Sequence, residues 1–197
     1  GKAGVEVGTE KAWELCDKYN LPRMVYVTEM DMDDASFRNV VEELTARYGK
    51  VIAPHFQPIR ENEQLVGYVN VIKNAARRYT GIGQREECEI PDYCLPNLKI
   101  YRDTLLETVA ETSEDLMERY FAGEEFSVEE IRSALRVNVM DGSIVPVGMG
   151  SNTMAQGVAN LLSDIVRFFP SPDKRECVGF NRTTCLLYTS PSPRDRS

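Results

Sequence analysis

Apolar residues recur along this chain with two spacings, and each predicts its own kind of element. Spacings of three and four predict helices at residues 9–19, 34–48 and 97–111, in a run through Leu116 ending near Gly123, in a run opened by Ser127, and at residues 155–169. Short apolar runs predict strands at residues 23–27, 51–56, 65–72 and 144–149. Strand and helix alternate at both ends of the chain, which predicts an α/β fold with a parallel sheet.

The middle of the chain has a different pattern. The stretch from about residue 50 to 137 is rich first in predicted strands and then in predicted helices. Between about residues 73 and 96 the apolar residues show no clear spacing. This change predicts an inserted subdomain. No internal repeat is present in the sequence.

Several residues mark where helices begin and end. Asp33 or Asp34 is expected to cap the helix at 34–48, and Gly49 is placed to end it. Ser127 with Glu130 predicts a capping box. The apolar side of the final helix is formed by Val158, Leu161, Leu162, Ile165, Val166 and Phe169.

Composition and charge narrow the class of protein. The 197 residues are 42% hydrophobic and 27% charged, which is ordinary for a soluble globular protein. A net charge of −8 argues against broad nonspecific binding to nucleic acid or anionic membranes. No apolar run approaches the roughly 18 residues of a membrane helix. The opening residues 1–4 resemble no signal peptide and lack an initiator Met, so we expect a truncated start and a cytoplasmic protein.

The cysteines and the single histidine suggest no reactive site. The cysteines form no CxxC pair, so we expect reduced thiols without a disulfide or metal role. They are Cys16, Cys88, Cys94, Cys177 and Cys185. His55 stands in an apolar, Pro-flanked stretch, and a structural or surface role is favoured over catalysis or metal binding.

The last sixteen residues differ from the rest. Residues 182–197, RTTCLLYTSPSPRDRS, are rich in Ser, Thr, Pro and Arg. A natural disordered linker with a phosphorylation site is one interpretation. We favour the other, translated cloning or sequencing-adapter sequence, and leave the segment out of the fold.

Two loops carry candidate chemistry, because each follows an apolar strand and precedes a helix. Ligands of open α/β sheets bind where such loops lie. The first loop runs from Thr28 through Glu29 to Asp31, and the second contains Ser151 and Asn152. A carboxylate in the first loop can accept two hydrogen bonds from guanine but not from adenine. Backbone N–H groups in the second can donate to the guanine carbonyl oxygen.

Long collinear motifs resemble the elongation factor G family of translational GTPases. They are GVEVGTEKAWELCDKYNLPRMVYVTEMDMDDASF, VGYVNVIK, ETSEDLMERYFAGEEFSVEEIRSALRVNVMDGSIVPVGMGS and VANLLSDIVRFFPSP. The resemblance covers about residues 4–181. It implies the C-terminal part of a P-loop GTPase G domain with an inserted α+β subdomain. The implied segments are 1–49 and 138–172 for the G domain, 50–137 for the insert, 173–181 for a linker and 182–197 for the tail.

The resemblance also implies a nucleotide site. The family's guanine-recognising Asn-Lys-x-Asp motif aligns with Thr28-Glu29-Met30-Asp31, and its Ser-Ala loop aligns with Ser151-Asn152. Thr28 replaces the family's Asn and lacks its side-chain amide, which braces neighbouring loops. Glu29 replaces the family's Lys, whose apolar stem lies across the base, and reverses its charge. Asp31 and Ser151 are kept. GTP or GDP is the implied ligand, at a site that still prefers guanine but binds it more weakly.

The sequence contains no phosphate-binding GxxxxGK[ST] loop and no DxPGH switch motif. This chain alone is therefore expected neither to hydrolyse GTP nor to hold magnesium. Magnesium is expected only in the full-length protein. The implied partner is the ribosome, with stalk proteins meeting the insert, and we expect a monomer that binds no DNA and no membrane. A nucleotide-indifferent ribosome-binding or ribosome-protection paralogue is the main alternative. An unrelated α/β domain is the weaker one.

Overall fold

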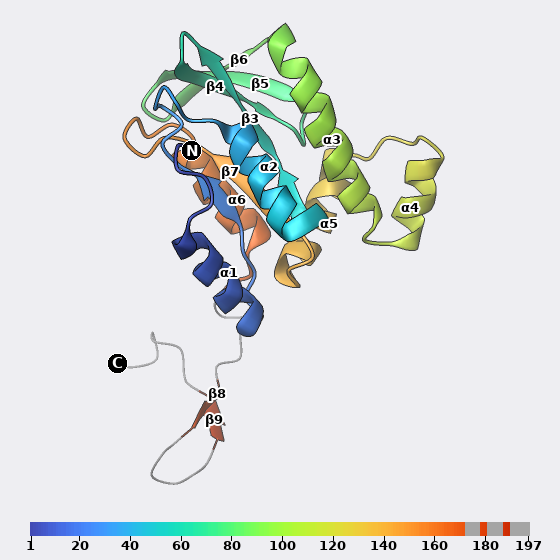
Figure 1. Cartoon of the computed structure of the whole chain (residues 1–197). Helices are drawn as coiled ribbons and strands as arrows, with labels where there is room; N and C mark the ends of the chain where they lie inside the picture. Colours follow the sequence, from blue (N-terminus) through green and yellow to red (C-terminus); the bar gives the residue numbers. More distant parts are fainter. Residues whose placement is uncertain (172–177, 181–186, 190–197) are drawn as a thin grey trace.

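The computed structural model describes residues 1–171, 178–180 and 187–189. Figure 1 shows the helices and strands in sequence colours. In chain order the elements are α1 Val7–Lys18, β1 Val25–Val27, α2 Phe37–Tyr48, η1 Gly49–Val51, β2 Ile52–Pro54, β3 Phe56–Glu61, β4 Gln64–Asn70, β5 Ala75–Gly81, β6 Gln84–Cys88, η2 Asp92–Cys94, α3 Leu95–Ala110, α4 Glu114–Phe121, α5 Val128–Met140, β7 Val145–Met149, α6 Val158–Phe168, β8 Val178–Phe180 and β9 Leu187–Thr189.

A small parallel sheet brings the two ends of the fold together. Its order is β1-β7-β2, and both neighbours run parallel to β7. Every residue of β7 is buried, as expected for a central parallel strand covered on both faces. The α/β fold with a parallel sheet is therefore confirmed. β2 belongs to this sheet, although it lies within residues 50–137, where the inserted subdomain was expected.

A second sheet of four antiparallel strands follows β2 directly. Its order is β3-β4-β5-β6, so each strand pairs with the next along the chain. β5 and β6 occupy part of the stretch in which the sequence showed no clear period. Five of their twelve residues are charged and only one is buried. A strand with little buried surface carries little apolar alternation.

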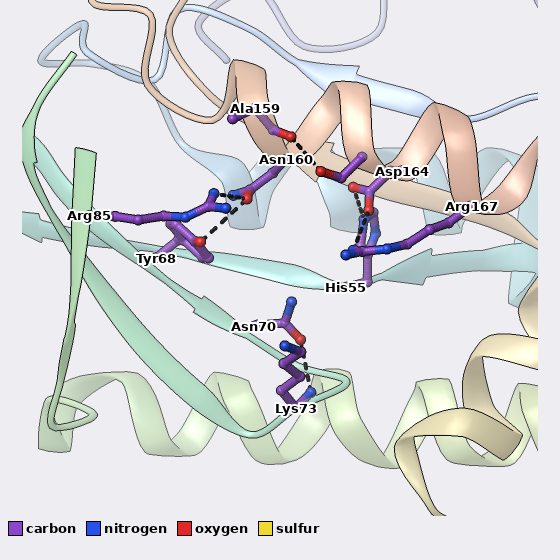
Figure 2. A network of polar contacts seen from close by, with 10 residues as sticks. His55, Tyr68, Asn70, Lys73, Arg85, Ala159, Asn160, Asp164 and Arg167 are labelled. Atoms are coloured by element: carbon purple, nitrogen blue, oxygen red, sulfur yellow. Dashed lines mark hydrogen bonds and ion pairs between the residues drawn. The ribbon is translucent and has the colours of Figure 1, made fainter. Parts of the chain in front are cut away.

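The two faces of the four-stranded sheet meet different helices. Val69 and Ala76 are paired neighbours with almost no exposed surface, on the face toward α3. Arg102 of α3 donates a hydrogen bond to the carbonyl oxygen of Val71 at 2.9 Å. On the opposite face lie Tyr68 and Arg85, which point toward α6 (Figure 2). Helices α3 and α6 thus lie on opposite faces of this sheet (Figure 2).

The helix ends are partly as expected. The capping box of Ser127 and Glu130 is present, and Gly49 follows α2 with a φ of 79°. The N-cap of α2 is Ser36, whose hydroxyl accepts from the backbone N–H of Asn39 at 3.3 Å, so the expected cap at Asp33 or Asp34 is wrong. The residues before Ser36 form a turn instead, because Arg60 binds their carbonyl oxygens.

Helix α6 turns its polar side toward the protein. Its apolar side is largely exposed in the described residues, at 60% for Leu162 and 77% for Val166. Asn160 and Asp164 are buried instead, and Nε2 of His55 lies 2.9 Å from a carboxylate oxygen of Asp164 (Figure 2). His55 is 1% exposed, which agrees with the expected structural role.

The C-terminal segment is described only in part. β8 and β9 pair as an antiparallel ladder. The linker predicted at 173–181 and the tail predicted at 182–197 lie mostly outside the described residues, as do Cys177 and Cys185. The other three cysteines are free thiols, and they are Cys16, Cys88 and Cys94.

Candidate functional site

The two loops singled out from the sequence lie beside each other. They follow β1 and β7, which are neighbouring parallel strands and therefore end at the same edge of the sheet. The backbone N–H of Gly150 donates to Val27 at 2.9 Å, and the N–H of Met30 donates to Gly150 at 3.2 Å. The strand pairing thus continues into the loops and joins them.

The first loop exposes two of its candidate residues and half-buries the third. Thr28 and Glu29 are exposed, and Met30 between them and Asp31 is fully buried as an anchor. Glu29 has a φ of 59°, a left-handed conformation that costs a non-glycine residue of the order of 1 kcal/mol. Strain of this kind persists where the surrounding structure holds it in place, here through buried Met30.

Asp31 is the chemically open group of the loop. Within the described part of the chain its carboxylate forms no ion pair, and one oxygen, Oδ1, is enclosed without a hydrogen-bond donor. An enclosed carboxylate oxygen without a donor is costly. Asp31 therefore retains the capacity to accept hydrogen bonds from a ligand.

The second loop is a closed turn that ties up the backbone donor of Ser151 but leaves that of Asn152 free in the described residues. Ser151 is fully buried, its N–H donates to the carbonyl oxygen of Gln156 at 2.9 Å, and its hydroxyl accepts from Met154 at 3.0 Å. Its N–H is therefore not available to a ligand. Asn152 is exposed, and its N–H donates to no acceptor in the described residues. Of the two candidate residues, Asn152 is thus the one whose backbone donor remains available.

Arg60 on β3 was not anticipated from the sequence. Its guanidinium donates to the carbonyl oxygens of Ala35 at 2.7 Å, Met32 at 2.8 Å, Met30 at 3.3 Å and Asp33 at 3.4 Å. One side chain of the four-stranded sheet therefore holds the whole segment after the first loop. The guanidinium also donates to the carbonyl oxygen of Glu63. An arginine near the end of a strand carries no local signal of this role, because the loop carbonyl oxygens lie 25 to 30 residues before it.

Tyr26 and Gly150 are closely packed behind the second loop. A side chain at Gly150 would overlap the hydroxyl of Tyr26 and the carbonyl oxygen of Gln156, so only glycine fits. Burial, with a smaller contribution from the charge of Asp164, raises the pKa of Tyr26 to about 12. Tyr26 is therefore a neutral packing group at physiological pH.

A cavity of about 290 Å³ opens beside the first loop, between the start of the chain, β1 and α2. Thr28 and Glu29 line it, whereas Asp31, Ser151 and Asn152 do not. The structure therefore gathers the candidate residues at one sheet edge but does not enclose them in one pocket.

Comparison with known proteins assigns the family. Residues 1–171 match the family model described as the elongation factor Tu GTP binding domain. The chain belongs to this family. The resemblance to elongation factor G is also confirmed. The chain is 36% identical to the elongation factor G of Neorickettsia sennetsu in an alignment 198 residues long, which covers 98% of this chain and 29% of that protein.

A solved structure supports the same assignment. A crystal structure of a protein from Thermus thermophilus superposes with a TM-score of 0.78 and 35% identity, covering 89% of this chain and 26% of that one. The chain thus spans less than a third of the length of either relative. Members of this GTP-binding family are translational GTPases, and the chain is a G-domain relative of elongation factor G.

Membrane spans and metal clusters are both lacking in the described residues. No helix among them is long and apolar enough to cross a membrane. No group of three or more His, Cys, Asp or Glu residues in the described part is placed to hold a metal ion.

Proposed function

We propose that this chain recognises the guanine base of GTP or GDP within a GTP-hydrolysing translation factor related to elongation factor G. The observation that carries the proposal is Asp31, whose enclosed Oδ1 has no hydrogen-bond donor among the described residues. Its loop is joined by hydrogen bonds to the second loop. The family match supports a guanine nucleotide as the ligand.

The chemistry of selection follows from the donor pattern of the base. Guanine presents an N1–H and an exocyclic amine side by side, and one carboxylate accepts from both. Adenine has no such pair, so Asp31 would remain unpaired beside it, at a cost of about 1–3 kcal/mol. The N–H of Asn152 supplies the donor for the guanine carbonyl oxygen, where adenine carries an amine.

Thr28 and Glu29 set the expected strength of this site. Thr28 offers no amide, and Glu29 places an exposed negative charge beside a negatively charged ligand. Losing one good contact reduces affinity roughly ten- to a hundredfold. We therefore propose a guanine-selective site of reduced affinity.

The arrangement of the sheets supports the proposed place of this chain in the domain. β1 is an edge strand of the described parallel sheet, and the apolar side of α6 next to it is exposed. An open strand edge beside an uncovered apolar face suits the packing of further strands. We propose that the chain is the C-terminal part of a G domain, with phosphate binding supplied by other parts of a longer protein.

The proposed setting is a cytoplasmic factor that works on the ribosome. Relationship to elongation factor G supports ribosome association in general. The four-stranded sheet with helices α3 to α5 is the proposed inserted subdomain, and stalk proteins are its proposed partners. Whether the factor translocates or protects the ribosome is a property of the whole protein, not of this chain.

Binding of the nucleosides guanosine and adenosine to the 197-residue chain tests base recognition without phosphates. We expect saturation-transfer NMR to show guanosine binding at least roughly tenfold more tightly than adenosine, and Asp31→Ala to remove the preference. Asp33→Ala is the matched control, because Asp33 is an exposed carboxylate of the same segment. Equal affinity for the two nucleosides would overturn the proposal. It would favour the nucleotide-indifferent paralogue, because the negative charge of Glu29 opposes binding of a nucleotide.

A further inference from the structure

A second cavity lies on the α6 face of the four-stranded sheet, between α6 and strands β4 to β6. It has a volume of about 110 Å³, and we call it the α6–sheet pocket. Four cationic side chains line it, together with the polar Asn70 and Ser163 and the carboxylate of Glu87. The cations are Lys73, Arg77, Arg85 and Arg167. Such a gathering of positive charge is unexpected in a chain of net charge −8.

The strand register explains why these side chains share one face. Arg77 of β5 pairs opposite Tyr68 of β4, and Arg85 of β6 pairs opposite Tyr79, two residues further along β5. Side chains directly opposite each other lie on the same side of a sheet, and so do residues two apart on a strand. Lys73 follows β4 in the turn to β5. Figure 2 shows Lys73 at this turn, Arg85 on β6 and Arg167 on α6.

The positive charges are incompletely compensated by the protein. Arg77 pairs with Glu87 at 2.9 Å. Arg167 lies 3.8 Å from Asp164, a carboxylate that is also 2.9 Å from His55. In the described part of the chain, Lys73 and Arg85 form no ion pair. A pocket that keeps two cations without carboxylate partners has a positive field for an incoming anion.

One of these cations is held in place by neutral groups. The guanidinium of Arg85 donates to the side-chain oxygen of Asn160, and the hydroxyl of Tyr68 donates to the same oxygen at 3.3 Å. Asn160 is only 8% exposed, so it is a fixed support on α6. Arg85 has therefore lost much of its freedom before any ligand arrives, and this lowers the entropic cost of binding.

We propose that the α6–sheet pocket is a binding site for a phosphoryl group. Arginine guanidinium groups suit phosphate because their forked N–H donors match its oxygens, and Lys73 adds a compact point charge. The volume is below the roughly 300–1,000 Å³ of pockets that enclose drug-sized ligands, so a nucleoside does not fit inside. The ligand is therefore a free phosphate or diphosphate, or a phosphate of an RNA backbone whose bases stay outside.

This site is independent of the proposed guanine site. None of the residues that line it belongs to the loops after β1 and β7. Failure of the guanosine experiment would therefore leave the phosphoryl proposal standing, and the reverse also holds.

The test is a titration of the 197-residue chain with inorganic phosphate at constant ionic strength, followed through the Nε–H signals of arginine in 1H–15N spectra. We expect saturable shifts at Arg85 with a Kd of about 1 mM. Lys73→Gln should raise the Kd about tenfold without disturbing the fold, because Lys73 is exposed in a turn, and adding Arg85→Gln should remove binding.

Arg78→Gln is the matched control. Arg78 follows Arg77 on β5, faces the other side of the sheet and pairs with Glu61. The Kd of Arg78→Gln for phosphate should stay within about twofold of that of the parent chain. No saturation at about 50 mM phosphate, or an equal loss in Arg78→Gln and Lys73→Gln, would overturn the proposal.

A short single-stranded RNA, added in parallel, distinguishes the sources of the phosphoryl group. Binding that inorganic phosphate competes away and that Lys73→Gln weakens assigns the site to an RNA backbone. Binding of phosphate and pyrophosphate without RNA binding assigns it to a small anion. RNA binding that Lys73→Gln leaves unchanged, with no phosphate binding, contradicts the proposal.

Discussion

Replacement of Arg60 by Met is the most direct test of how the first loop is held. The substitution keeps an unbranched apolar stem and removes the guanidinium, which donates to four carbonyl oxygens of residues 30–35. No other charged side chain of the described residues reaches these oxygens. The variant should therefore loosen the segment between Asp31 and helix α2.

The magnitude follows from the quality of the contacts. The bonds to Ala35 at 2.7 Å and Met32 at 2.8 Å are short, whereas those to Met30 and Asp33 lie near the limit of a hydrogen bond. A hydrogen bond from a charged group contributes about 1.5–3 kcal/mol, and water replaces part of it here because Arg60 is only half-buried. We expect a loss of roughly 2–3 kcal/mol, which in a domain of this size lowers Tm by about 4–12 °C.

Two measurements together check this expectation. Thermal unfolding gives the change in Tm, and amide hydrogen exchange should accelerate selectively at residues 30–36. Arg38→Met is the control, because Arg38 is an exposed arginine with a single ion pair to Glu42, and exposed ion pairs contribute little to stability. The reasoning is refuted if Arg60→Met unfolds at the temperature of Arg38→Met with unchanged exchange at residues 30–36.

Two further predictions concern the packing behind the second loop. Gly150→Ala should cost about 3 kcal/mol or more, seen as a lower urea midpoint, since its methyl group would overlap a backbone oxygen that cannot move away. Gly8→Ala, in open space on α1, should be neutral or stabilising, and equal effects of the two changes would contradict this account. The folded-state pKa of Tyr26, about 12, lies above the ordinary 10.0, so its contribution to stability is full below about pH 10 and is lost as the pH rises to about 12. The urea midpoint should therefore fall less in Tyr26→Phe than in the parent between about pH 9 and pH 11.5, and parallel falls would exclude this role.

The orientation of α6 links the fold to the proposals. A helix normally buries its apolar side, yet here Asp164 and Asn160 face the protein, bonded to His55 and to Tyr68 and Arg85. The same polar contacts position Arg85 for the α6–sheet pocket. The exposed apolar side of α6 is then free for the further strands that we propose for a longer protein.

Much of the framework was readable from the sequence, because its signals are local. The strand ending at Val27 and the buried strand Val145–Met149 stand as short apolar runs, and the capping box of Ser127 spans only four residues. The family motifs are likewise continuous stretches. The sequence alone therefore predicted that the two loops exist and which residues they contain.

The tertiary structure decided what depends on distant partners. Arg60 binds a loop 25 to 30 residues before it, and His55 meets Asp164 across 109 residues, so neither role leaves a local pattern. The polar strands β5 and β6 bury little surface and are placed in the sheet by pairing with their neighbours. Local spacing therefore determined which elements form, whereas strand register and long-range hydrogen bonds determined which side chains meet.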